Sequence, residues 1–383
     1  MSEGSAVLIA VGDIAFGDHP LCVGFGTHSR NRGHHPGFAF DHVREALGGG
    51  DFVFGNLECA ISSAGLRVGD YDSIQMRGQP NYVTGLAHAG FNILNIANNH
   101  SLQHGEQPFN ETIELLRQSG IAVCGVNDGD CRHARQVSLV RNGLCTAFLG
   151  YSLRPRQYFT QDPLYAEGFS EALLSDVREA RQSADCVVVT LHWGSEFIER
   201  PSPEEVEIAH RIMDAGADLI IGHHPHVLRG IEQYGRGYIV YSLGNFVCDM
   251  VWKDNLRETA IVKFSLSKGG AQLLETVPVR INDEYQPVAM RNGQGSNILK
   301  RIQTMSRDLV AKASGAVPND SREEYQVAAD LEQHMNRSLS HRYFLRHIYR
   351  FPPAIVIQQL RTFIRNRLVE RGVISRPDTT SGC

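Results

Sequence analysis

The sequence contains no C-x-x-C pair, although eight cysteines are scattered along its 383 residues. Closely spaced cysteines are typical of disulfide frameworks and of zinc-binding knuckles. Half of the cysteines lie in or beside apolar runs, namely Cys124, Cys145, Cys186 and Cys248. We therefore expect reduced cysteines packed in a core, rather than a protein stabilised by disulfides or by cysteine-bound zinc.

A long apolar segment is also lacking. No stretch approaches the roughly 20 apolar residues that span a bilayer. The chain begins MSEGSAVLIAVGD, where the leader is acidic and the apolar stretch is too short for a secretory signal. These features predict a cytoplasmic protein.

Charge differs between two parts of the chain. Residues 1–295 carry 23 Lys and Arg against 34 Asp and Glu, a net −11, whereas residues 296–383 carry 14 against 8, a net +6. A chain of this length can bury one large core plus an appendage, or two ordinary domains. We predict a main domain over residues 1–290 and a basic helical C-terminal extension over residues 291–383.

Short apolar runs alternate with segments of helical periodicity. The runs are Ala6–Val11, Phe52–Phe54, Phe91–Ile96, Ile121–Val126, Thr146–Leu149, Cys186–Leu191, Leu219–Ile221, Tyr238–Tyr241 and Ala260–Leu266. The helical segments are Phe40–Leu47, Pro80–His88, Gln107–Ser119, Ser170–Ser183 and Pro203–Ala215, with further ones at Ile298–Ala313 and from Ser321 onward. Strands that alternate with helices predict an α/β layered domain with a largely buried sheet.

Polar side chains follow five of the apolar runs where each strand would end, which in α/β folds is where ligands bind. In chain order they are Asp13, Asn56 with Glu58, Asn99 with His100, His192, and the His224/His226 pair of the GHHPH segment. Each of these patterns is common by itself, since Gly-Asp after a strand usually marks a turn and a histidine pair can arise by chance. Together, oxygen and imidazole donors without thiolates suit Mn²⁺, Fe or Zn²⁺ in a hydrolytic site.

Six segments, in this order, resemble the CapA family, which is associated with poly-γ-glutamate capsule synthesis and belongs to the calcineurin-like metallophosphoesterase superfamily. They are VGDIAFGD, FGNLECAIS, NIANNHSLQHG, VTLHWGSEF, GADLIIGHHPHV and IVYSLGNFVCD, within residues 6–265. The resemblance implies a four-layer α/β/β/α sandwich with metal ligands on loops at strand ends. It implies metal-ligand roles for Asp13, Asn99, His192, His224 and His226, and a catalytic role for His100.

Two departures from the superfamily pattern concern the metal site. The first superfamily motif is Asp-x-His, but Asp13 is followed by Ile14 and Ala15, so one histidine ligand is missing. The second motif supplies a carboxylate that bridges two metals, and here the position is Asn56, which is neutral. Glu58 would supply the missing charge as a further ligand if its loop folds inward. We expect one or two Mn, Fe or Zn ions, with one held more securely than two.

Several residues near the predicted ligands have open roles. His100 would donate a hydrogen bond to developing charge or a proton to a leaving group, or else support the ligands structurally. Asn245 would orient a ligand or substrate, or only complete a turn. Trp193 and Glu196 are candidates for holding His192 in place, and Asn56 is a further supporting residue.

A cationic cluster near the predicted crevice offers a substrate site. Arg154 and Arg156, with Tyr158, follow the run that ends at Leu149. Guanidinium groups bind phosphate and carboxylate equally well, so the substrate is predicted only as an anionic phosphoester or polyglutamate-like chain. The alternative is a solvated loop.

The C-terminal segment from Arg337 to Arg376 contains nine arginines and one acid, Glu370. An apolar stripe at helical spacing consists of Ile357, Leu360, Ile364 and Leu368. This pattern is typical of a basic amphipathic helix, which would either lie on an anionic membrane surface or pack on the acidic domain or another subunit. No nucleic-acid partner is expected.

Two functions fit these features. The first is a CapA-type metal-dependent hydrolase acting on a phosphoester or an amide-linked polymer such as poly-γ-glutamate. The second is a non-catalytic accessory protein in synthesis or export of a capsule polymer, which uses the same pocket to bind an anionic chain.

Overall fold

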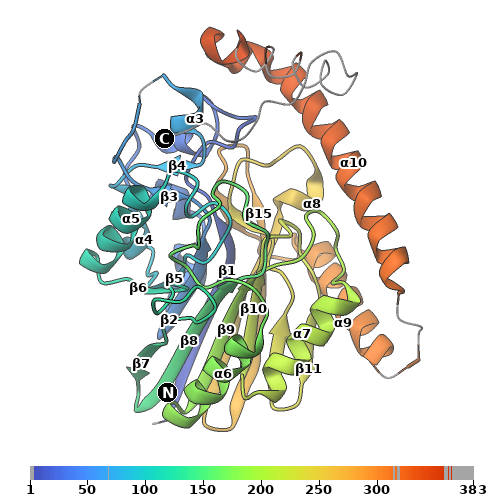
Figure 1. Cartoon of the computed structure of the whole chain (residues 1–383). Coiled ribbons are helices and arrows are strands. Elements are labelled where there is room, and N and C mark those ends of the chain that lie inside the picture. The colour runs from blue at the N-terminus through green and yellow to red at the C-terminus, as the bar shows by residue number, and fades with distance from the viewer. Residues whose placement is uncertain are drawn as a thin grey trace.

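Two large β-sheets form the framework of the computed structural model, which describes residues 4–67, 69–313, 315–316, 320–357, 361 and 364 (Figure 1). The first sheet has the order β16-β15-β14-β1-β2-β5-β6, with β13 paired to β1. Its strands are β1 (Ser5–Ile14), β2 (Phe52–Leu57), β5 (Ile93–Asn95), β6 (Ala122–Cys124), β13 (Asn245–Val247), β14 (Glu258–Ser267), β15 (Gly270–Ile281) and β16 (Pro287–Ala289).

The second sheet has the order β11-β12-β10-β9-β8-β7. Its strands are β7 (Val137–Arg141), β8 (Leu144–Ser152), β9 (Cys186–His192), β10 (Leu219–His223), β11 (Ile231–Tyr234) and β12 (Gly237–Val240). A small separate sheet pairs β3 (Ala60–Ile61) with β4 (Arg77–Gly78). Each predicted apolar run overlaps a strand.

Helices connect the strands of the sandwich. They are α1 (Thr27–Asn31), η1 (Phe38–Phe40), α2 (Arg44–Leu47), α3 (Tyr71–Ile74), α4 (Tyr82–His88), α5 (Glu106–Gln118), α6 (Glu171–Ser183), α7 (Pro203–Asp214) and α8 (Asp254–Arg257). α4 and α5 pack on the first sheet, and α6 and α7 pack on the second (Figure 1). The core between the sheets joins Leu8 and Phe54 of one sheet to Phe148 and Val188 of the other. The predicted four-layer α/β/β/α sandwich is therefore confirmed.

Parallel strands bring their carboxyl ends to one end of the sandwich. β1, β2 and β5 run parallel in the first sheet, and β8, β9, β10 and β12 do so in the second. Their ends lie opposite the N-terminus of the chain (Figure 1). The register places Asp13 beside Asn56 and His192 beside His223. We call this end the site end.

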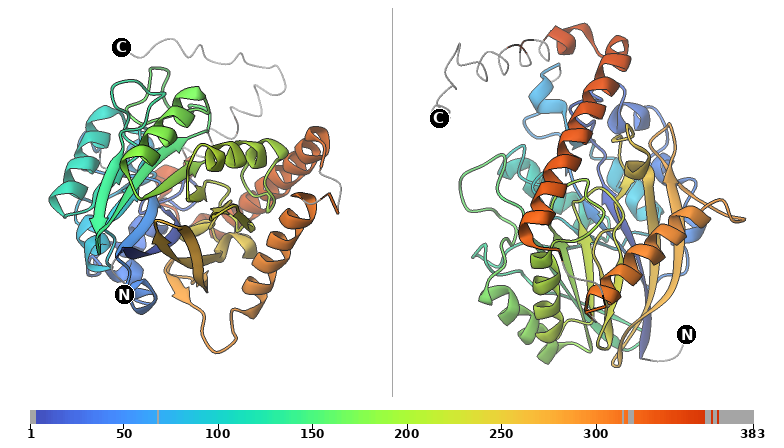
Figure 2. Two further views of the ribbon diagram at one scale, coloured as in Figure 1. Left: turned by 90° about the horizontal axis from the view of Figure 1, so that it is seen from below. Right: turned by 90° about the vertical axis from the view of Figure 1, so that its right-hand side faces the viewer.

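The C-terminal extension contains two long helices on one side of the sandwich, α9 (Ser296–Ala313) and α10 (Arg322–His347), followed by η2 (Ile348–Arg350) (Figure 2). Ile298 and Ile302 of α9 join the core between the sheets. α10 begins with a capping box in which Ser321 and Glu324 bond each other's backbone N–H. These helices agree with the predicted ones, whereas the domain boundary at residue 290 stays a prediction.

α10 forms an ion pair and a hydrogen bond with loops that lie near the site end. Glu332 forms an ion pair of 2.8 Å with Lys253, and Asn336 accepts a hydrogen bond of 2.8 Å from the Trp252 indole. Tyr325 packs in a small cluster with Ile198. None of the described helices combines the length and the apolar character needed to cross a bilayer.

Two buried carboxyl groups organise the loop that follows β1. Asp18 accepts hydrogen bonds from the backbone N–H groups of Gly24 and Ser29, at 2.9 and 3.0 Å. Asp249 Oδ2 accepts from the N–H groups of His19 and Thr27, at 2.9 and 3.1 Å. Burial, reinforced by the negative charge of Asp18, raises the pKa of Asp249 from 3.8 to about 8.

Asp249 is expected to make a contribution to stability that falls between pH 5 and pH 8. Its pKa in the folded state lies above the ordinary 3.8. The contribution is therefore complete below pH 3.8 and is lost as the pH rises through about 8. Asp249→Asn keeps the acceptor oxygen and removes the titrating group. The free energy of unfolding of wild type, measured by urea denaturation, should therefore fall relative to that of Asp249→Asn by about 1 kcal/mol per pH unit in this window.

The exposed Asp308 provides the matched control for this experiment. Asp308→Asn also removes one carboxyl group and should retain the wild-type pH profile. If Asp249→Asn and wild type lose stability at the same rate between pH 5 and pH 8, the buried carboxyl is not the cause.

Candidate metal centre

The site end gathers buried polar side chains from both sheets. The Asn56 amide on β2 donates a hydrogen bond of 2.8 Å to Asp13 Oδ1 at the end of β1. His192 and His223 end neighbouring strands of the other sheet. The two pairs meet across the sandwich, because His223 Nδ1 lies 3.2 Å from Asp13 Oδ1. The register thus builds one cluster from strands far apart in the sequence.

The GHHPH segment leaves β10 through a strained turn. His224 and His226 have φ values of 93° and 59°, in the left-handed region that residues with a side chain seldom adopt. Each such residue costs on the order of 1–3 kcal/mol, and strain of this kind concentrates at functional sites. Asp13 Oδ2 holds the turn by accepting the His224 backbone N–H at 3.1 Å. The two imidazole rings consequently lie with their centroids 5.5 Å apart.

Glu58, His224 and His226 form a group that fits a divalent metal ion. One ligand atom from each lies within 4.8 Å of the others, and all three residues are buried. Glu58 Oε1 and both ring nitrogens of His224 make no hydrogen bond, a costly state for buried polar atoms. His226 Nδ1 bonds Asn245 Oδ1 at 3.0 Å, which leaves Nε2 as an acceptor 3.8 Å from Glu58 Oε1. Buried acceptors that face each other without donors fit a bound cation.

The protonation states of the cluster also favour a cation. Burial, with the added charge of Asp13, raises the pKa of Glu58 well above its ordinary value. Burial lowers the pKa of His192 and His224 well below theirs, so both rings are in the neutral form that binds metals. Burial acts to raise the pKa of Asp13, but its hydrogen bond with His223 and the charges of nearby histidines hold that pKa below the ordinary value. A divalent ion would offset the negative charge that Glu58 and Asp13 carry when both are ionised at this buried position.

The other predicted ligands lie around this group of three. His192 Nε2 lies 2.7 Å from Asn99 Oδ1 and 3.4 Å from Glu58 Oε1. The Asn99 amide donates a hydrogen bond of 2.8 Å to Gln157. All of the predicted metal-ligand roles stay predictions, and Glu58, His224 and His226 are the three residues whose ligand atoms lie within 4.8 Å of one another.

His100 lies partly exposed at the edge of the cluster. Its Nδ1 lies 2.8 Å from Gln103 Oε1, and its ring lies 5.4 Å from that of Tyr158. Burial lowers the pKa of His100 to about 4, with a smaller opposing effect of the Gln103 bond. The ring is therefore oriented by Gln103 and lies beside Tyr158.

Trp193 does not hold His192, contrary to the expectation from sequence. Its indole donates a hydrogen bond of 3.1 Å to the Tyr241 carbonyl, within the core under α6 and α7. Successive side chains of a strand point to opposite faces, so His192 points between the sheets and Trp193 points outward. Asn56 Nδ2 and Asn99 Oδ1 hold the His192 ring instead, at 3.3 and 2.7 Å.

Arg154 and Glu196 flank His224. Glu196 Oε1 lies 4.0 Å from His224 Nε2, so this carboxylate accompanies His224 rather than His192. Arg154 donates a hydrogen bond of 2.7 Å to the Gly194 carbonyl, while its Nε is buried without a partner. After burial and His192, the charge of Arg154 is the next cause that lowers the pKa of His224. Arg154 thus places a cation beside the cluster.

Arg156, predicted to bind substrate, is engaged elsewhere. Its guanidinium forms ion pairs with Glu167 and Asp162. It also donates hydrogen bonds to the carbonyls of Thr160 and Gln161, at 3.1 and 2.9 Å. These partners engage all three nitrogen atoms of the guanidinium group. Arg156 is therefore not positioned to bind a ligand at the cluster.

The sequence-based prediction missed two histidines of the site. His223 was passed over in favour of His224 and His226, yet it is the last residue of β10 and its ring lies 3.2 Å from Asp13 across the sandwich. His19 is fixed by a hydrogen bond of 3.1 Å from the Leu21 N–H to its Nδ1. Burial and the charges of His100 and His226 lower the pKa of His19 to about 3, so its ring lies within electrostatic reach of both. Its position six residues after Asp13 was the available signal.

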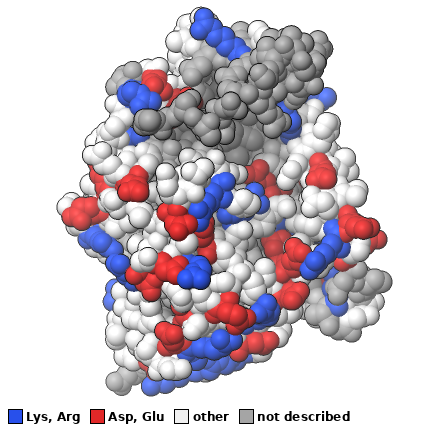
Figure 3. Space-filling model, in the orientation of Figure 1, with Lys and Arg blue, Asp and Glu red and all other residues white. Residues whose placement is uncertain are grey.

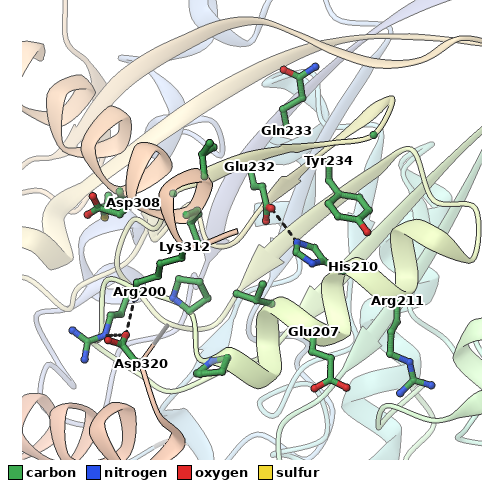
Figure 4. A pocket seen from close by; sticks show the side chains of 18 of the residues that line it. Arg200, Glu207, His210, Arg211, Glu232, Gln233, Tyr234, Asp308, Lys312 and Asp320 are labelled. Atoms are coloured by element: carbon green, nitrogen blue, oxygen red, sulfur yellow. Dashed lines mark hydrogen bonds and ion pairs between the residues drawn. The ribbon is translucent and has the colours of Figure 1, made fainter. Parts of the chain in front are cut away.

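A separate hollow of about 1000 Å³ lies between α7, β11 and α9 (Figure 4). His210 lies 3.0 Å from Glu232 there, and Tyr234 stacks on the His210 ring. None of the described residues that line it is a predicted site residue. Two of its acidic groups form ion pairs, Asp320 with Arg200 and Lys312, and Glu232 with His210.

Comparison with known proteins agrees with the motifs. The model of the family described as bacterial capsule synthesis protein PGA_cap matches residues 7–250. A capsule biosynthesis protein CapA of Bacillus anthracis is 31% identical over 71% of this chain and 67% of its own length. The PGA biosynthesis protein CapA of Bacillus subtilis (strain 168) is 32% identical over 64% and 65%. A probable polyglutamine synthesis accessory protein of Mycobacterium tuberculosis is 26% identical over 59% and 65%.

The chain thus spans about two thirds of the length of these curated relatives. Among solved structures, a putative 5'-nucleotidase from Staphylococcus aureus aligns with a TM-score of 0.46 and 15% identity, over 78% of this chain and 58% of that one. The family model covers well over half of the 383 residues and includes every strand end that contributes to the cluster. The chain therefore belongs to the bacterial capsule synthesis protein PGA_cap family, which includes the CapA proteins.

Proposed function

We propose that the protein is a metal-dependent hydrolase that cleaves an anionic substrate, either an amide-linked polyglutamate-like chain or a phosphoester, in the synthesis of a capsule polymer. The observation that carries this proposal is the buried group of Glu58, His224 and His226. Glu58 Oε1 and both ring nitrogens of His224 have no hydrogen-bond partner among the described residues, and together with His226 they fit a divalent cation.

Each residue of the cluster has a role in this proposal. Glu58, His224 and His226 would hold the ion, with Asp13, Asn99 and His192 as further ligands around it. A bound divalent ion would act as a Lewis acid and lower the pKa of a water molecule from 15.7 to about 7. His100, at the edge of the cluster, would donate a hydrogen bond or a proton to the leaving group.

Arg154 would select an anionic substrate. Its guanidinium is anchored on the Gly194 carbonyl beside His224, and its buried Nε lacks a partner. A buried donor without a partner costs free energy that an incoming carboxylate or phosphate oxygen would recover. The relatives named for capsule and PGA biosynthesis make the polyglutamate-like chain the first substrate to test.

A second candidate function is that of an accessory protein that binds the polymer without cleaving it. The relative named as a probable polyglutamine synthesis accessory protein favours this role. The neutral Asn56 also favours it, since its amide donates to Asp13 and its oxygen accepts from Asn95 at 2.8 Å, so it offers no bridging charge for a second metal ion.

Hydrolysis by the purified protein distinguishes these functions. We expect the metal-loaded protein to cleave either a synthetic γ-linked glutamate oligomer or a p-nitrophenyl phosphoester, as detected by mass spectrometry or absorbance. Removal of the metal by a chelator should abolish cleavage. Glu58→Gln should lower kcat by about 100-fold or more, the size of effect seen when a group that stabilises charge in the transition state is lost. If the protein holds its metal and binds the oligomer but cleaves neither substrate, the accessory role replaces the hydrolase.

A further inference from the structure

The C-terminal half of α10 carries positive charge that no nearby acid offsets. The sequence has no Asp or Glu between Glu332 and Glu370. Arg337, Arg342 and Arg346 are exposed, and none of them pairs with a carboxylate in the part of the chain that is described. Over the sandwich, by contrast, acidic and basic side chains are interspersed (Figure 3).

Apolar side chains are exposed among these arginines. Leu345 and Tyr349 are 64% and 79% exposed, and beyond η2 Ile357 is 51% exposed. Asn336 and Ser340, on the opposite side of α10, are buried. At about 3.6 residues per turn, Arg342, Leu345 and Tyr349 lie opposite these two buried residues, and Arg337 and Arg346 lie on the two flanks. We call these five exposed residues the basic face.

The basic face lies at the site end of the sandwich. Phe351 and Ile355, just beyond η2, are buried against Cys22, Val23 and Phe25. These three residues belong to the loop that follows β1, whose last residues include Asp13. Arg350 lies over the Phe25 ring at 4.3 Å. This packing holds the end of α10 against the loop that follows β1, beside the metal cluster. It buries only some of the apolar side chains of the extension.

The predicted packing of this segment on the main domain holds for two residues, and its predicted contact with a membrane surface stays a prediction. Phe351 and Ile355 pack on the main domain. Leu345, Tyr349 and Ile357 remain in solvent, as does Ile364 at 55% exposure. Leu360 and Leu368 of the predicted stripe lie outside the described residues.

We propose that the basic face docks the protein on a membrane that contains anionic lipids, with the site end turned toward the bilayer. Arginines attract anionic headgroups, and exposed Leu, Tyr and Ile side chains enter the boundary between headgroups and acyl chains. The charge of the face and of such a surface are complementary.

The composition of the face argues against two other occupants. A second copy of the chain would bring arginines against arginines at the same face, which is unfavourable. A nucleic acid would match the charge but not the exposed aliphatic side chains, because base recognition uses stacking and hydrogen bonds. A bilayer uses both features of the face.

Vesicle flotation tests the proposal without any measure of activity. Wild type should float with phosphatidylcholine vesicles that contain phosphatidylserine and should stay unbound with phosphatidylcholine alone. Arg337→Gln/Arg342→Gln/Arg346→Gln should lower partitioning on the order of 100-fold, from about fivefold per basic residue. Leu345→Ser/Tyr349→Ser should also weaken binding while keeping the charge.

A matched triple variant controls for the loss of charge. Arg117, Lys300 and Arg307 are exposed and lie in other helices, so Arg117→Gln/Lys300→Gln/Arg307→Gln should float as wild type does. Light scattering after size exclusion measures the mass in solution, and circular dichroism checks folding. Equal flotation of wild type and the basic-face triple variant would overturn the proposal. So would a dimer in solution that dissociates on Leu345→Ser/Tyr349→Ser.

Discussion

Substitution of His224 by asparagine is expected to abolish or greatly reduce the divalent metal content of the purified protein. Wild type should contain about one Mn, Fe or Zn per chain by elemental mass spectrometry, because Glu58, His224 and His226 converge at one buried point. Loss of one of three ligands should weaken metal binding by about 100-fold or more, the upper range seen even for residues that only support ligands. Asparagine tolerates the left-handed backbone at φ 93°, so the turn itself is retained.

His210 serves as the matched control for this substitution. It lies in the hollow between α7 and β11, paired with Glu232 and away from the cluster. His210→Asn should leave the metal content unchanged. If wild type grown and purified with added Mn, Fe and Zn contains no ion and binds none on titration, the cluster is not a metal centre, and the hydrolase proposal is lost with it.

Substitution of His100 by glutamine is expected to lower kcat by roughly 10²- to 10⁴-fold, the usual contribution of a positioned acid or base. His100 lies at the edge of the cluster and contacts Gln103, not the three central ligands. The metal content and KM should therefore change little. A parallel fall in metal content would show instead that His100 supports the ligand loop.

The dependence on the leaving group separates catalysis from support. A group that donates a proton to the leaving oxygen or nitrogen matters most when that leaving group is basic. The effect of His100→Gln should be small for a p-nitrophenyl ester and large for an alkyl ester or an amide. An equal effect on all substrates would contradict proton donation by His100.

The layered fold was predictable because its central strands are buried on both faces. The run Cys186–Leu191, for example, is buried at every position and is apolar except for Thr190, as is typical of strands between two layers. β15 was not predicted, although it is twelve residues long. Its outer residues are exposed at positions such as Leu274, and its sequence alternates weakly, so the pattern alone did not distinguish it from a loop.

The members of the cluster were predictable from strand ends, but their contacts were not. That Asp13 and Asn56 are neighbours follows from strand register, which single-strand patterns do not contain. His223 meets Asp13 across the two sheets, and His224 and His226 are placed by a turn in which both have positive φ, an arrangement that the single-strand pattern does not contain. Trp193 was misplaced for the converse reason, since strand alternation continues up to the end of β9 and turns its indole outward.

The C-terminal extension shows a third limit of sequence patterns. Its helices follow from periodicity and from the Ser321 capping box. The partners of α10 do not, because Lys253, Trp252 and Ile198 lie far away in the sequence and their contacts with α10 are single polar bonds or small clusters. Long-range polar contacts leave no periodic trace in either partner.

The contacts of α10 bear on how the protein is made. α10 lies near the end of the chain, yet it fastens Trp252 and Lys253, and Trp252 in turn packs on His19 with ring centroids 5.2 Å apart. A growing chain can build both sheets before α10 leaves the ribosome. The loops around the metal cluster acquire their last contacts only afterward. Nascent chains stalled before residue 322 should therefore present a formed sandwich with loose site loops, so that metal uptake becomes a late step of biosynthesis.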